Sequence, residues 1–256
     1  MENNKKIKHV SALFELKKIG KIMLKINNLF KRYGKTEVLK GASLNVKQGT
    51  IKGLIGTNGS GKSTLIECVC GIKGFDSGDI LINGKSALDK RNRNEIKRSL
   101  GYMPQSFSLF TDLTVEENLN YLTAVYGIKN KNRVEEIIKL CKLEPHRKRL
   151  AKNLSGGYRQ LLSLACAIIH NPQFLLLDEP TAAMDPLFRK QFWDIVKEYN
   201  KTGHTILIIT HYMEELVECD DFACLSGGEV SFEGSVQEFK KGGMLNIEGL
   251  LSKYSF

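Results

Sequence analysis

The sequence predicts an α/β fold in which a parallel sheet is joined to an N-terminal antiparallel β subdomain and an inserted α-helical subdomain. Three mainly apolar stretches without alternation, at residues 51–56, 174–178 and 205–210, indicate strands that are buried on both faces of a parallel sheet. From Met23 onward, short alternating segments separated by turn residues indicate β-strands. Between about 106 and 153 the apolar spacing becomes helical, and we place the helical subdomain at roughly 106–170.

Local patterns support the individual elements. The stretch ILINGK at 80–85 contains the pair Asn83-Gly84, which is typical of two-residue turns, and it predicts a hairpin. Helical spacing in TVEENLNYLTAVYG (114–127) and NRVEEIIKLCKL (132–143) predicts two helices, each bounded by Gly, Asn or Pro. Both helices fall between the first two buried strands, so the helical subdomain is an insertion in the α/β core.

The composition is that of a soluble globular protein, with 42% hydrophobic and 26% charged residues in a chain of 256 residues. This length suffices for one elaborated α/β domain or for two close-packed subdomains. The longest apolar stretches, TILIIT and LLSLACAII, are well short of the roughly 20 residues that cross a bilayer. A role at a membrane would therefore require a separate membrane-spanning chain.

The cysteines form neither a CxxC pair nor a Cys/His metal pattern, and most of them lie in apolar periodic segments. They are Cys68, Cys70, Cys141, Cys166, Cys219 and Cys224. This usage predicts reduced core thiols in a cytosolic protein.

The chain is basic, with a formal net charge of +10. Lysines are concentrated in the first 22 residues, and further positive charge lies in KRNRNEIKR and HRKRLAK. Solvated surface accounts for such segments, and attraction to an anionic cytoplasmic membrane face is the second interpretation. No nucleic-acid partner is expected.

Residues 1–22 are predicted to be a basic N-terminal extension, and residues 23–256 the folded domain. Met23 is a candidate alternative start, so a chain truncated there is expected to fold and to remain active. As an alternative, Val10, Leu13 and Phe14 belong to an imperfect amphipathic helix that lies on a membrane or on a partner protein.

A phosphate-binding loop follows the first buried strand. The sequence GTNGSGKST matches GxxxxGK[ST], and a helical pattern follows it, as this motif requires. Its glycines allow backbone N–H groups to surround phosphate oxygens, and the helix N-terminus adds partial positive charge. Lys62 would reach the β- and γ-phosphates, and the Ser63 hydroxyl would bind Mg²⁺. The predicted loop residues are Gly56, Thr57, Asn58, Gly59, Ser60, Gly61, Lys62, Ser63 and Thr64. The parallel sheet therefore belongs to a P-loop NTPase core.

Two further strands deliver polar residues to the same edge of the sheet. Asp178 ends the strand FLLLD, where a buried carboxylate needs a charged partner, and Mg²⁺ would supply it. Glu179 follows at the carboxyl end of the sheet and is the predicted general base for the attacking water. His211 follows TILIIT and is placed to contact the γ-phosphate. The other histidines, at 9, 146, 170 and 204, receive no role.

The tetrapeptide LSGG occurs twice, at 154–157 and at 225–228. After the first copy, apolar residues at helical spacing indicate that Ser155, Gly156 and Gly157 begin a helix, whose free N–H groups can bind an anion. The second copy lies between two β-like segments and predicts a hairpin turn without a helix dipole. Only the first copy is expected to bind phosphate.

These motifs, in this order, make the chain from Leu24 onward resemble the ATP-binding subunit of an ABC transporter. The resemblance also includes an aromatic residue in KRYG, a Q-loop in GYMPQ, a signature LSGGYRQ and a D-loop AAMD. It implies that Tyr33 stacks on adenine, that Gln105 contacts Mg²⁺ and senses a membrane partner, and that Asp185 lies at a dimer interface. The signature of one subunit, with Gln160 at its end, would close over ATP bound to the other.

What the resemblance implies is an ATPase that powers transport across a membrane. ATP would join two copies, or one copy and a related ATPase subunit, head to tail at the cytoplasmic face of the cell membrane. Integral membrane transporter subunits would contact the surface near 106–112, where Phe107 and Phe110 are candidate contacts. The segments GYMPQSFSLFTDLTVEENL and FWDIVKEYNKTGHTILIITHYMEEL resemble bacterial ABC-2-type exporters of drugs, antibiotics or polysaccharides.

The sequence departs from the family pattern at two places, and the detailed contacts of these residues are not predicted. The signature has Tyr158 where glutamine is commonest, and the D-loop has Ala183-Met184 where an Ala-Leu pair is frequent. One alternative function is a soluble ABC-type ATPase that acts on DNA or ribosomes. Another is a nucleotide-binding module without turnover, which conflicts with the presence of Glu179 and His211.

Overall fold

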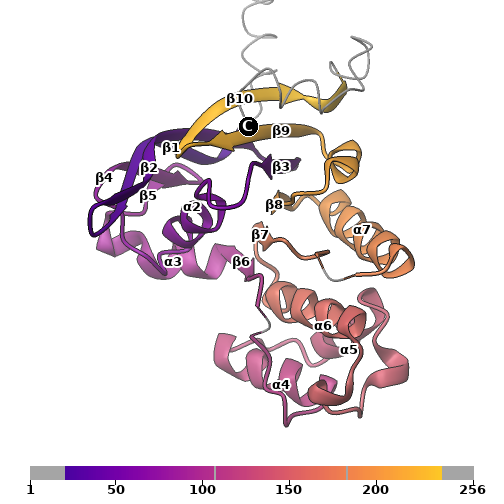
Figure 1. Cartoon of the computed structure of the whole chain (residues 1–256). Helices are drawn as coiled ribbons and strands as arrows, with labels where there is room; N and C mark the ends of the chain where they lie inside the picture. Colours follow the sequence, from indigo (N-terminus) through magenta and orange to yellow (C-terminus); the bar gives the residue numbers. More distant parts are fainter. Residues whose placement is uncertain (1–20, 107, 183, 238–256) are drawn as a thin grey trace, which may run out of the picture.

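The computed structural model describes residues 21–106, 108–182 and 184–237 (Figure 1). The predicted extension, apart from its last two residues, lies outside this part of the chain, as does Phe107. The strands are β1 (Ile22–Tyr33), β2 (Thr36–Lys47), β3 (Ile51–Ile55), β4 (Ser77–Ile82), β5 (Lys85–Ser86), β6 (Leu100–Met103), β7 (Phe174–Asp178), β8 (Thr205–Ile209), β9 (Asp221–Ser226) and β10 (Glu229–Ser235). The α-helices are α2 (Lys62–Val69), α3 (Arg93–Ser99), α4 (Val115–Tyr126), α5 (Arg133–Leu140), α6 (Gly156–Ile168) and α7 (Pro186–Lys201). Four 3₁₀ turns span Lys90–Asn92, Glu144–His146, Ala151–Asn153 and Met213–Glu218.

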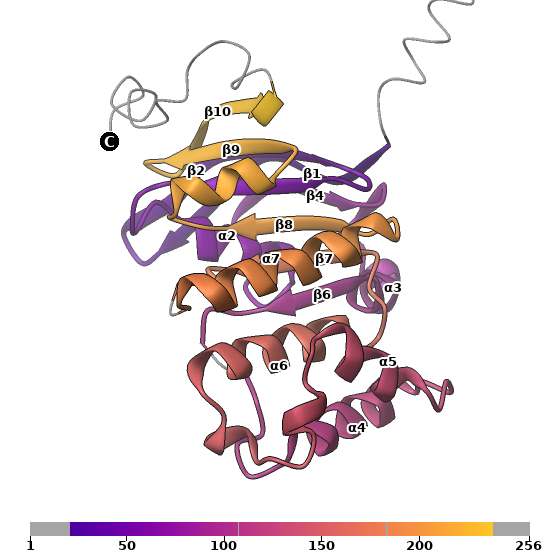
Figure 2. The ribbon, with the colours of Figure 1, turned by 90° about the vertical axis from the view of Figure 1, so that its right-hand side faces the viewer.

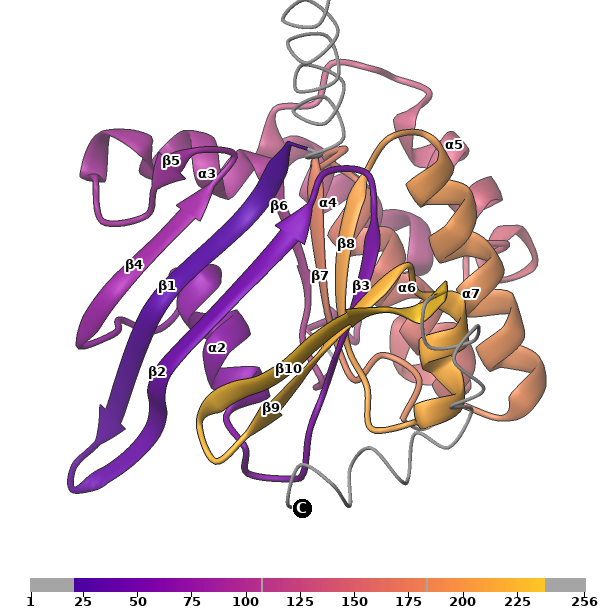
Figure 3. The ribbon, with the colours of Figure 1, turned by 90° about the horizontal axis from the view of Figure 1, so that it is seen from above.

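The strands form two sheets, and α2 lies between them (Figure 3). The smaller sheet is antiparallel and has the order β2-β1-β4-β5. The larger sheet has the order β10-β9-β3-β8-β7-β6, in which the five strands from β9 to β6 are parallel and β10 is an antiparallel edge. The predicted fold class is confirmed.

Two hydrophobic cores explain why the central strands are apolar without alternation. Every residue of β3, β7 and β8 is buried. Leu54, Leu176 and Leu207 pack in the core that contains α2, whereas Leu177 and Ile208 pack in the core that contains α6 and α7. Because successive side chains point to opposite faces of a sheet, a strand with a core on each face is apolar at nearly every position. Lys52 of β3 departs from this pattern, and its buried ammonium forms an ion pair with Glu233 of β10.

Both predicted turns are tight hairpins. Asn83 and Gly84 join β4 to β5 with φ angles of 50° and 76°, and Gly227 and Gly228 join β9 to β10 with φ angles of 54° and 91°. Two positive φ angles define the type I′ turn that matches the twist of paired strands. The second LSGG is therefore a hairpin turn, as predicted.

The helical part of the chain forms a layer on the far side of α6 from the sheet (Figure 2). Helix α4 begins with a capping box, in which Thr114 and Glu117 each accept a hydrogen bond from the other's backbone N–H. The Arg133 guanidinium, at the start of α5, donates hydrogen bonds to the carbonyl oxygens of Ile168 and Ile169 at 2.9 and 2.8 Å. These bonds satisfy carbonyls at the end of α6 and fix that helix to the layer.

In the described residues, none of the helices combines the length and the apolar character needed to span a bilayer. All six cysteines are free thiols, and four of them are buried. Burial raises the pKa of Cys68 to about 11, which favours an unreactive thiol.

The contact between β6 and α6 leads to a stability prediction. A Cβ on Gly101 would lie 2.4 Å from the carbonyl oxygen of Ala167, whereas a Cβ on Gly74 would meet nothing within 4 Å. Gly101→Ala must therefore separate the strand from the helix and is expected to destabilise the fold by about 1–3 kcal/mol. Gly74→Ala is the matched control and should be neutral or slightly stabilising. Urea titrations that give the two variants equal unfolding free energies would contradict this packing.

Candidate functional site

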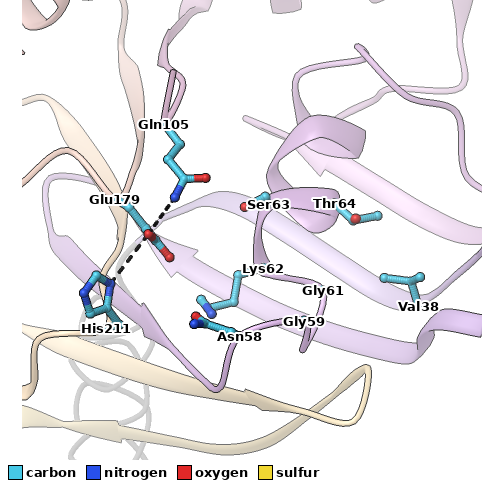
Figure 4. Close-up of a pocket in the computed structure, with 10 residues that line it drawn as sticks. All are labelled: Val38, Asn58, Gly59, Gly61, Lys62, Ser63, Thr64, Gln105, Glu179 and His211. Carbon is cyan, nitrogen blue, oxygen red and sulfur yellow. Dashed lines mark hydrogen bonds and ion pairs between the residues drawn. The ribbon is translucent and has the colours of Figure 1, made fainter. Parts of the chain in front are cut away.

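Loops at the carboxyl ends of four parallel strands line one cavity of about 600 Å³ (Figure 4). The loops follow β3, β6, β7 and β8, and the cavity lies where ligands of open α/β sheets bind. Its lining residues are Val38, Asn58, Gly59, Gly61, Lys62, Ser63, Thr64, Gln105, Glu179 and His211. The structure thus brings together motifs that are more than 150 residues apart in the sequence.

The loop between β3 and α2 has the backbone that its glycines predict. Gly59 and Gly61 have φ angles of 80° and 104°, in the left-handed region that favours glycine. A Cβ on Gly56 would lie 2.1 Å from the carbonyl oxygen of Leu225, so the loop can pass β9 only without a side chain there. Helix α2 begins at Lys62, immediately after this loop. Its first N–H groups therefore face the cavity side of the loop.

Lys62 is buried, and its Nζ donates hydrogen bonds to the carbonyl oxygens of Gly56 and Thr57 at 2.9 and 3.0 Å. Burial lowers the pKa of this ammonium, and the nearby charges of Glu179 and Asp178 oppose the effect. The Lys62 side chain thus lies against the backbone of the loop, near the carboxylates of Asp178 and Glu179.

These residues fit the phosphate groups of a nucleotide. Gly59 and Gly61 line the cavity with positive φ angles, and Lys62 begins a helix at the same place. Backbone N–H groups in such a glycine-rich loop and at a helix start can surround an anion.

The pair Ser63 and Asp178 fits a divalent cation. The Ser63 hydroxyl donates a hydrogen bond of 3.3 Å to Asp178 Oδ1. Asp178 is buried, and burial raises its pKa to about 6, because its negative charge is poorly solvated. Hydroxyl and carboxylate oxygens are ligands that Mg²⁺ prefers, usually completed by phosphate and water oxygens.

A chain of polar contacts joins the Q-loop, Glu179 and His211 (Figure 4). Gln105 Nε2 donates to Glu179 Oε2 at 2.9 Å, and His211 Nδ1 lies 3.6 Å from the same oxygen. Glu179 has a φ angle of 47°, a left-handed conformation that is strained in a residue other than glycine, and its N–H donates to the carbonyl oxygen of Ile209 at 3.0 Å. Such strain occurs where the surrounding structure fixes a side chain for a function.

Other predicted site residues do not line this cavity. Tyr33 ends β1 with its ring exposed, and the Lys31 and Lys73 ammonium nitrogens lie 5.2 and 5.3 Å from the ring centroid. The Asp185 carboxylate caps α7, because Oδ1 accepts hydrogen bonds from the N–H groups of Leu187 and Phe188 at 3.0 and 3.1 Å. Their predicted roles therefore depend on bound nucleotide or on a second chain.

The first LSGG begins α6, as predicted. Ser155 is the N-cap residue, is exposed, and makes no side-chain capping bond. Gly156 and Gly157 form the first turn of the helix. Gln160 lies one turn further on and is buried.

Two residues of this region carried no sequence signal. Val38 lines the cavity from β2, although its strand pattern is ordinary. The Phe188 ring fills the space beside Gly157, where a Cβ would lie 2.5 Å from Cγ of that ring. Phe188 and Tyr158 also contact each other edge to face, with ring centroids 4.9 Å apart. Only the fold brings the start of α7 to the start of α6.

Comparison with protein families decides the identity of the fold. A family model described as ABC transporter matches residues 39–182, more than half of the chain. The chain belongs to this family. Its cassette is 34% identical over 224 residues to the probable multidrug ABC transporter ATP-binding protein YbhF of Escherichia coli, covering 86% of this chain and 38% of YbhF. The chain therefore spans less than half the length of that relative.

Other relatives of the cassette have different names. The linearmycin resistance ATP-binding protein LnrL of Bacillus subtilis is 35% identical, covering 81% of this chain and 68% of LnrL. The methionine import ATP-binding protein MetN of Clostridioides difficile is also 35% identical, covering 84% of this chain and 70% of MetN.

Solved structures match over nearly the whole cassette. An ATP-binding subunit of an ABC transporter has a TM-score of 0.80 and 27% identity, and the match covers 91% of this chain and 99% of that one. The cassette MJ0796, solved as a dimer in a post-hydrolysis state with ADP and Pi, has a TM-score of 0.76 and 28% identity, covering 84% of this chain and 99% of MJ0796. The predicted ABC-family ATPase cassette is confirmed.

The contact between Gly157 and Phe188 leads to a second prediction. Gly157→Ala places a methyl group inside the Phe188 ring, so the ring and the start of α7 must move. We expect a loss of about 1–3 kcal/mol of stability. Phe188→Leu should recover part of this loss in the double variant, because it shortens the clashing side chain. Additive losses in thermal melts of the single and double variants would contradict the contact.

Proposed function

We propose that this cassette binds ATP with Mg²⁺, hydrolyses it in a head-to-tail dimer, and powers export through separate membrane-spanning subunits. The observation that carries the proposal is the division of the site between two places in one chain. Lys62, Ser63, Glu179 and His211 line the cavity, whereas the helix start at Ser155 does not. Two copies are needed to bring both parts to one nucleotide.

Several residues in and beside the cavity have proposed roles in hydrolysis. Lys62 and the N–H groups of the loop hold the β- and γ-phosphates, and the Tyr33 ring stacks on adenine. Ser63, Asp178 and Gln105 would hold Mg²⁺, which supplies positive charge that neutralises the phosphate oxygens. Glu179, aimed by its strained backbone, accepts a proton from the attacking water, and His211 contacts the γ-phosphate.

Dimerisation follows from electrostatics. The thirteen-residue helix α6 begins at Gly156 with the exposed Ser155 as its N-cap, and its first N–H groups carry partial positive charge. A γ-phosphate held by Lys62 of one copy supplies the anion for this helix start in the other. Asp185, at the nearby start of α7, would lie at the same interface. Hydrolysis removes the bridging charge and releases the two copies.

A groove of about 920 Å³ is the proposed contact with the membrane subunit. Apolar and aromatic side chains line one part of it, from Ile72, Tyr102, Val125 and Tyr126, and Ile72 and Val125 are 58% and 61% exposed. Polar and charged side chains of α3 line another part, from Asn94, Glu95, Lys97 and Arg98. Exposed apolar side chains gathered in a groove are typical of a docking surface. Phe110, in the predicted contact region, is also exposed. We propose as occupant a cytoplasmic amphipathic segment of the membrane-spanning partner, which places the cassette at the cytoplasmic face of the membrane.

Export is the proposed direction of transport. It is supported by the exporter-like segments around Gln105 and His211 and by the names of YbhF and LnrL, whereas MetN is named for import. The membrane subunit would select the cargo. The alternative of a soluble ATPase acting on DNA or ribosomes is not favoured, because these relatives carry transporter or resistance names.

Blocking the general base should trap the dimer. Glu179→Gln removes the proton acceptor and keeps the shape of the side chain, so ATP should bind and turnover should fall at least a hundredfold. With Mg²⁺ and ATP, light scattering should then give twice the monomer mass. Glu229→Gln is the matched control, because it also replaces a carboxylate by a carboxamide, at an exposed position of the β9–β10 hairpin. It should behave as the wild type. A Glu179→Gln protein that stays monomeric with saturating ATP would refute the proposal.

A second experiment tests the groove. Val125→Asp places a charge in the part of the groove that apolar and aromatic side chains line, and it should prevent co-purification of the membrane subunit, while ATP-dependent dimerisation remains. Leu88→Asp is the control, because Leu88 has the same 61% exposure and does not line the groove. Equal recovery of the membrane subunit with both variants would show that the groove is not the docking surface.

A further inference from the structure

A buried carboxylate lies behind the loop that carries His211. Glu215 belongs to the 3₁₀ turn Met213–Glu218 and is 2% exposed, yet it does not line the nucleotide cavity. A buried charge is costly unless charged or hydrogen-bonding groups compensate it. The partners of Glu215 therefore indicate why a glutamate occupies this position.

The first partner is the Thr210 hydroxyl, which donates a hydrogen bond of 2.6 Å to Glu215 Oε2. The same hydroxyl oxygen accepts a hydrogen bond of 3.0 Å from the N–H of Tyr212. Thr210 and Tyr212 are the two chain neighbours of His211. One carboxylate oxygen thus anchors, through a single hydroxyl, the backbone on both sides of this histidine.

The second partner is Arg189, on α7. Its Nε lies 3.7 Å from Glu215 Oε1, and both atoms are buried without a hydrogen-bond partner among the described residues. Arg189 Nη1 donates to the exposed Glu214 at 3.1 Å, and the guanidinium carbon lies 4.2 Å from the centroid of the Tyr212 ring. The arginine therefore holds the loop by charge and by stacking.

The same group of residues reaches the loop before α7. The Tyr212 hydroxyl donates a hydrogen bond of 3.2 Å to the carbonyl oxygen of Ala182, which follows Glu179 by three residues. Helix α7 begins just beyond, at Pro186. The position of His211 is consequently fixed relative to α7 and to the segment after Glu179.

The cavity itself constrains the histidine weakly. The His211 side chain is 40% exposed, its Nδ1 is 3.6 Å from Glu179 Oε2, and its ring contacts Tyr212 at a centroid distance of 4.1 Å. A misplacement of about 1 Å in a group that acts on the reacting phosphate can lower a rate about a hundredfold. The backbone on either side of His211 must then hold the imidazole in its position.

We infer that Thr210, Glu215 and Arg189 form a positioning network that sets His211 against the γ-phosphate, with Glu215 as its buried centre. This inference rests on the proposed role of His211 in hydrolysis. None of the three residues touches the cavity, so each acts through His211. Because Arg189 lies on α7, a shift of that helix would alter the position of His211 and with it the rate of hydrolysis.

The test compares two substitutions at Thr210 in the full chain. Thr210→Val keeps the shape of the side chain but removes the hydroxyl, and Thr210→Ser keeps the hydroxyl. We expect Thr210→Val to lower kcat about tenfold to a hundredfold with the KM for ATP nearly unchanged, and Thr210→Ser to stay within about threefold of the wild type. Thr205→Val is the control, because Thr205 is a buried threonine of β8 whose hydroxyl accepts a hydrogen bond from Gly49 at the distant end of the strand. It should cost stability without lowering kcat.

Combining Thr210→Val with His211→Ala shows whether the substitution at Thr210 lowers the rate through His211 or by disturbing the fold in general. If Thr210 acts through His211, Thr210→Val should cause no further loss of rate in the His211→Ala protein. Wild-type kcat in Thr210→Val, or an equal loss with and without His211, would overturn the inference. If Thr210→Val does not fold, Glu215→Gln carries the same comparison, because it keeps an acceptor for Thr210 and removes the charge that faces Arg189.

The same data distinguish the inference from the proposed function. Wild-type turnover in His211→Ala alone would refute the proposed role of His211, and with it the inference. A slow His211→Ala protein combined with unaffected Thr210→Val and Glu215→Gln proteins would overturn only the positioning network.

Discussion

Charge held at one edge of a buried sheet is the constraint on which this structure depends. Lys62 begins α2 after the loop that follows β3, Asp178 ends β7, and Glu179 follows Asp178, so all three lie near one another at the carboxyl edge of the sheet. Burial lowers the pKa of the lysine and raises that of Asp178, so each charge is poorly solvated where it lies. In the proposed function, a triphosphate with its cation would supply compensating charge of both signs. The glycine-rich loop and the helix start at Lys62 belong to the same arrangement.

The rest of the fold places the start of a second helix, α6, away from the carboxyl edge of the sheet. Helix α6 packs on the face of the sheet opposite α2, and Arg133 fixes its far end to the helical layer. Its N-cap residue, Ser155, is exposed and does not line the cavity of its own chain. In the proposed dimer, the energy of ATP binding comes from joining these two separated positive regions through one γ-phosphate. The helical layer would transmit that closure to the membrane subunit, because Val125 and Tyr126 of the groove end α4.

The sequence was sufficient to predict those elements whose local pattern has a single physical cause. Mainly apolar stretches without alternation predicted strands with a core on each face, and paired turn residues predicted both hairpins. The two copies of LSGG were separated correctly, because helical spacing follows one and β-like segments follow the other. The phosphate loop was predictable because backbone N–H groups can surround an anion only in a few glycine patterns.

Contacts between distant elements were not predictable in the same way. Nothing near Gly157 indicates that Phe188 fills the space beside it, and nothing near Glu215 indicates a buried carboxylate that anchors Thr210 and faces Arg189. Gln160, which the family resemblance places at the end of the signature, is buried in α6, and its own sequence neighbourhood does not show this burial. These features depend on how α6, α7 and the His211 loop pack together, which no local pattern records.

One measurement tests the central claim most directly: a structure of the protein with Mg²⁺ and a slowly hydrolysed ATP analogue. The account predicts two copies in which the γ-phosphate contacts Lys62 of one chain and the backbone N–H groups of residues 155–157 of the other. A nucleotide held by one chain alone, with residues 155–157 of every neighbouring copy far from any triphosphate, would contradict it.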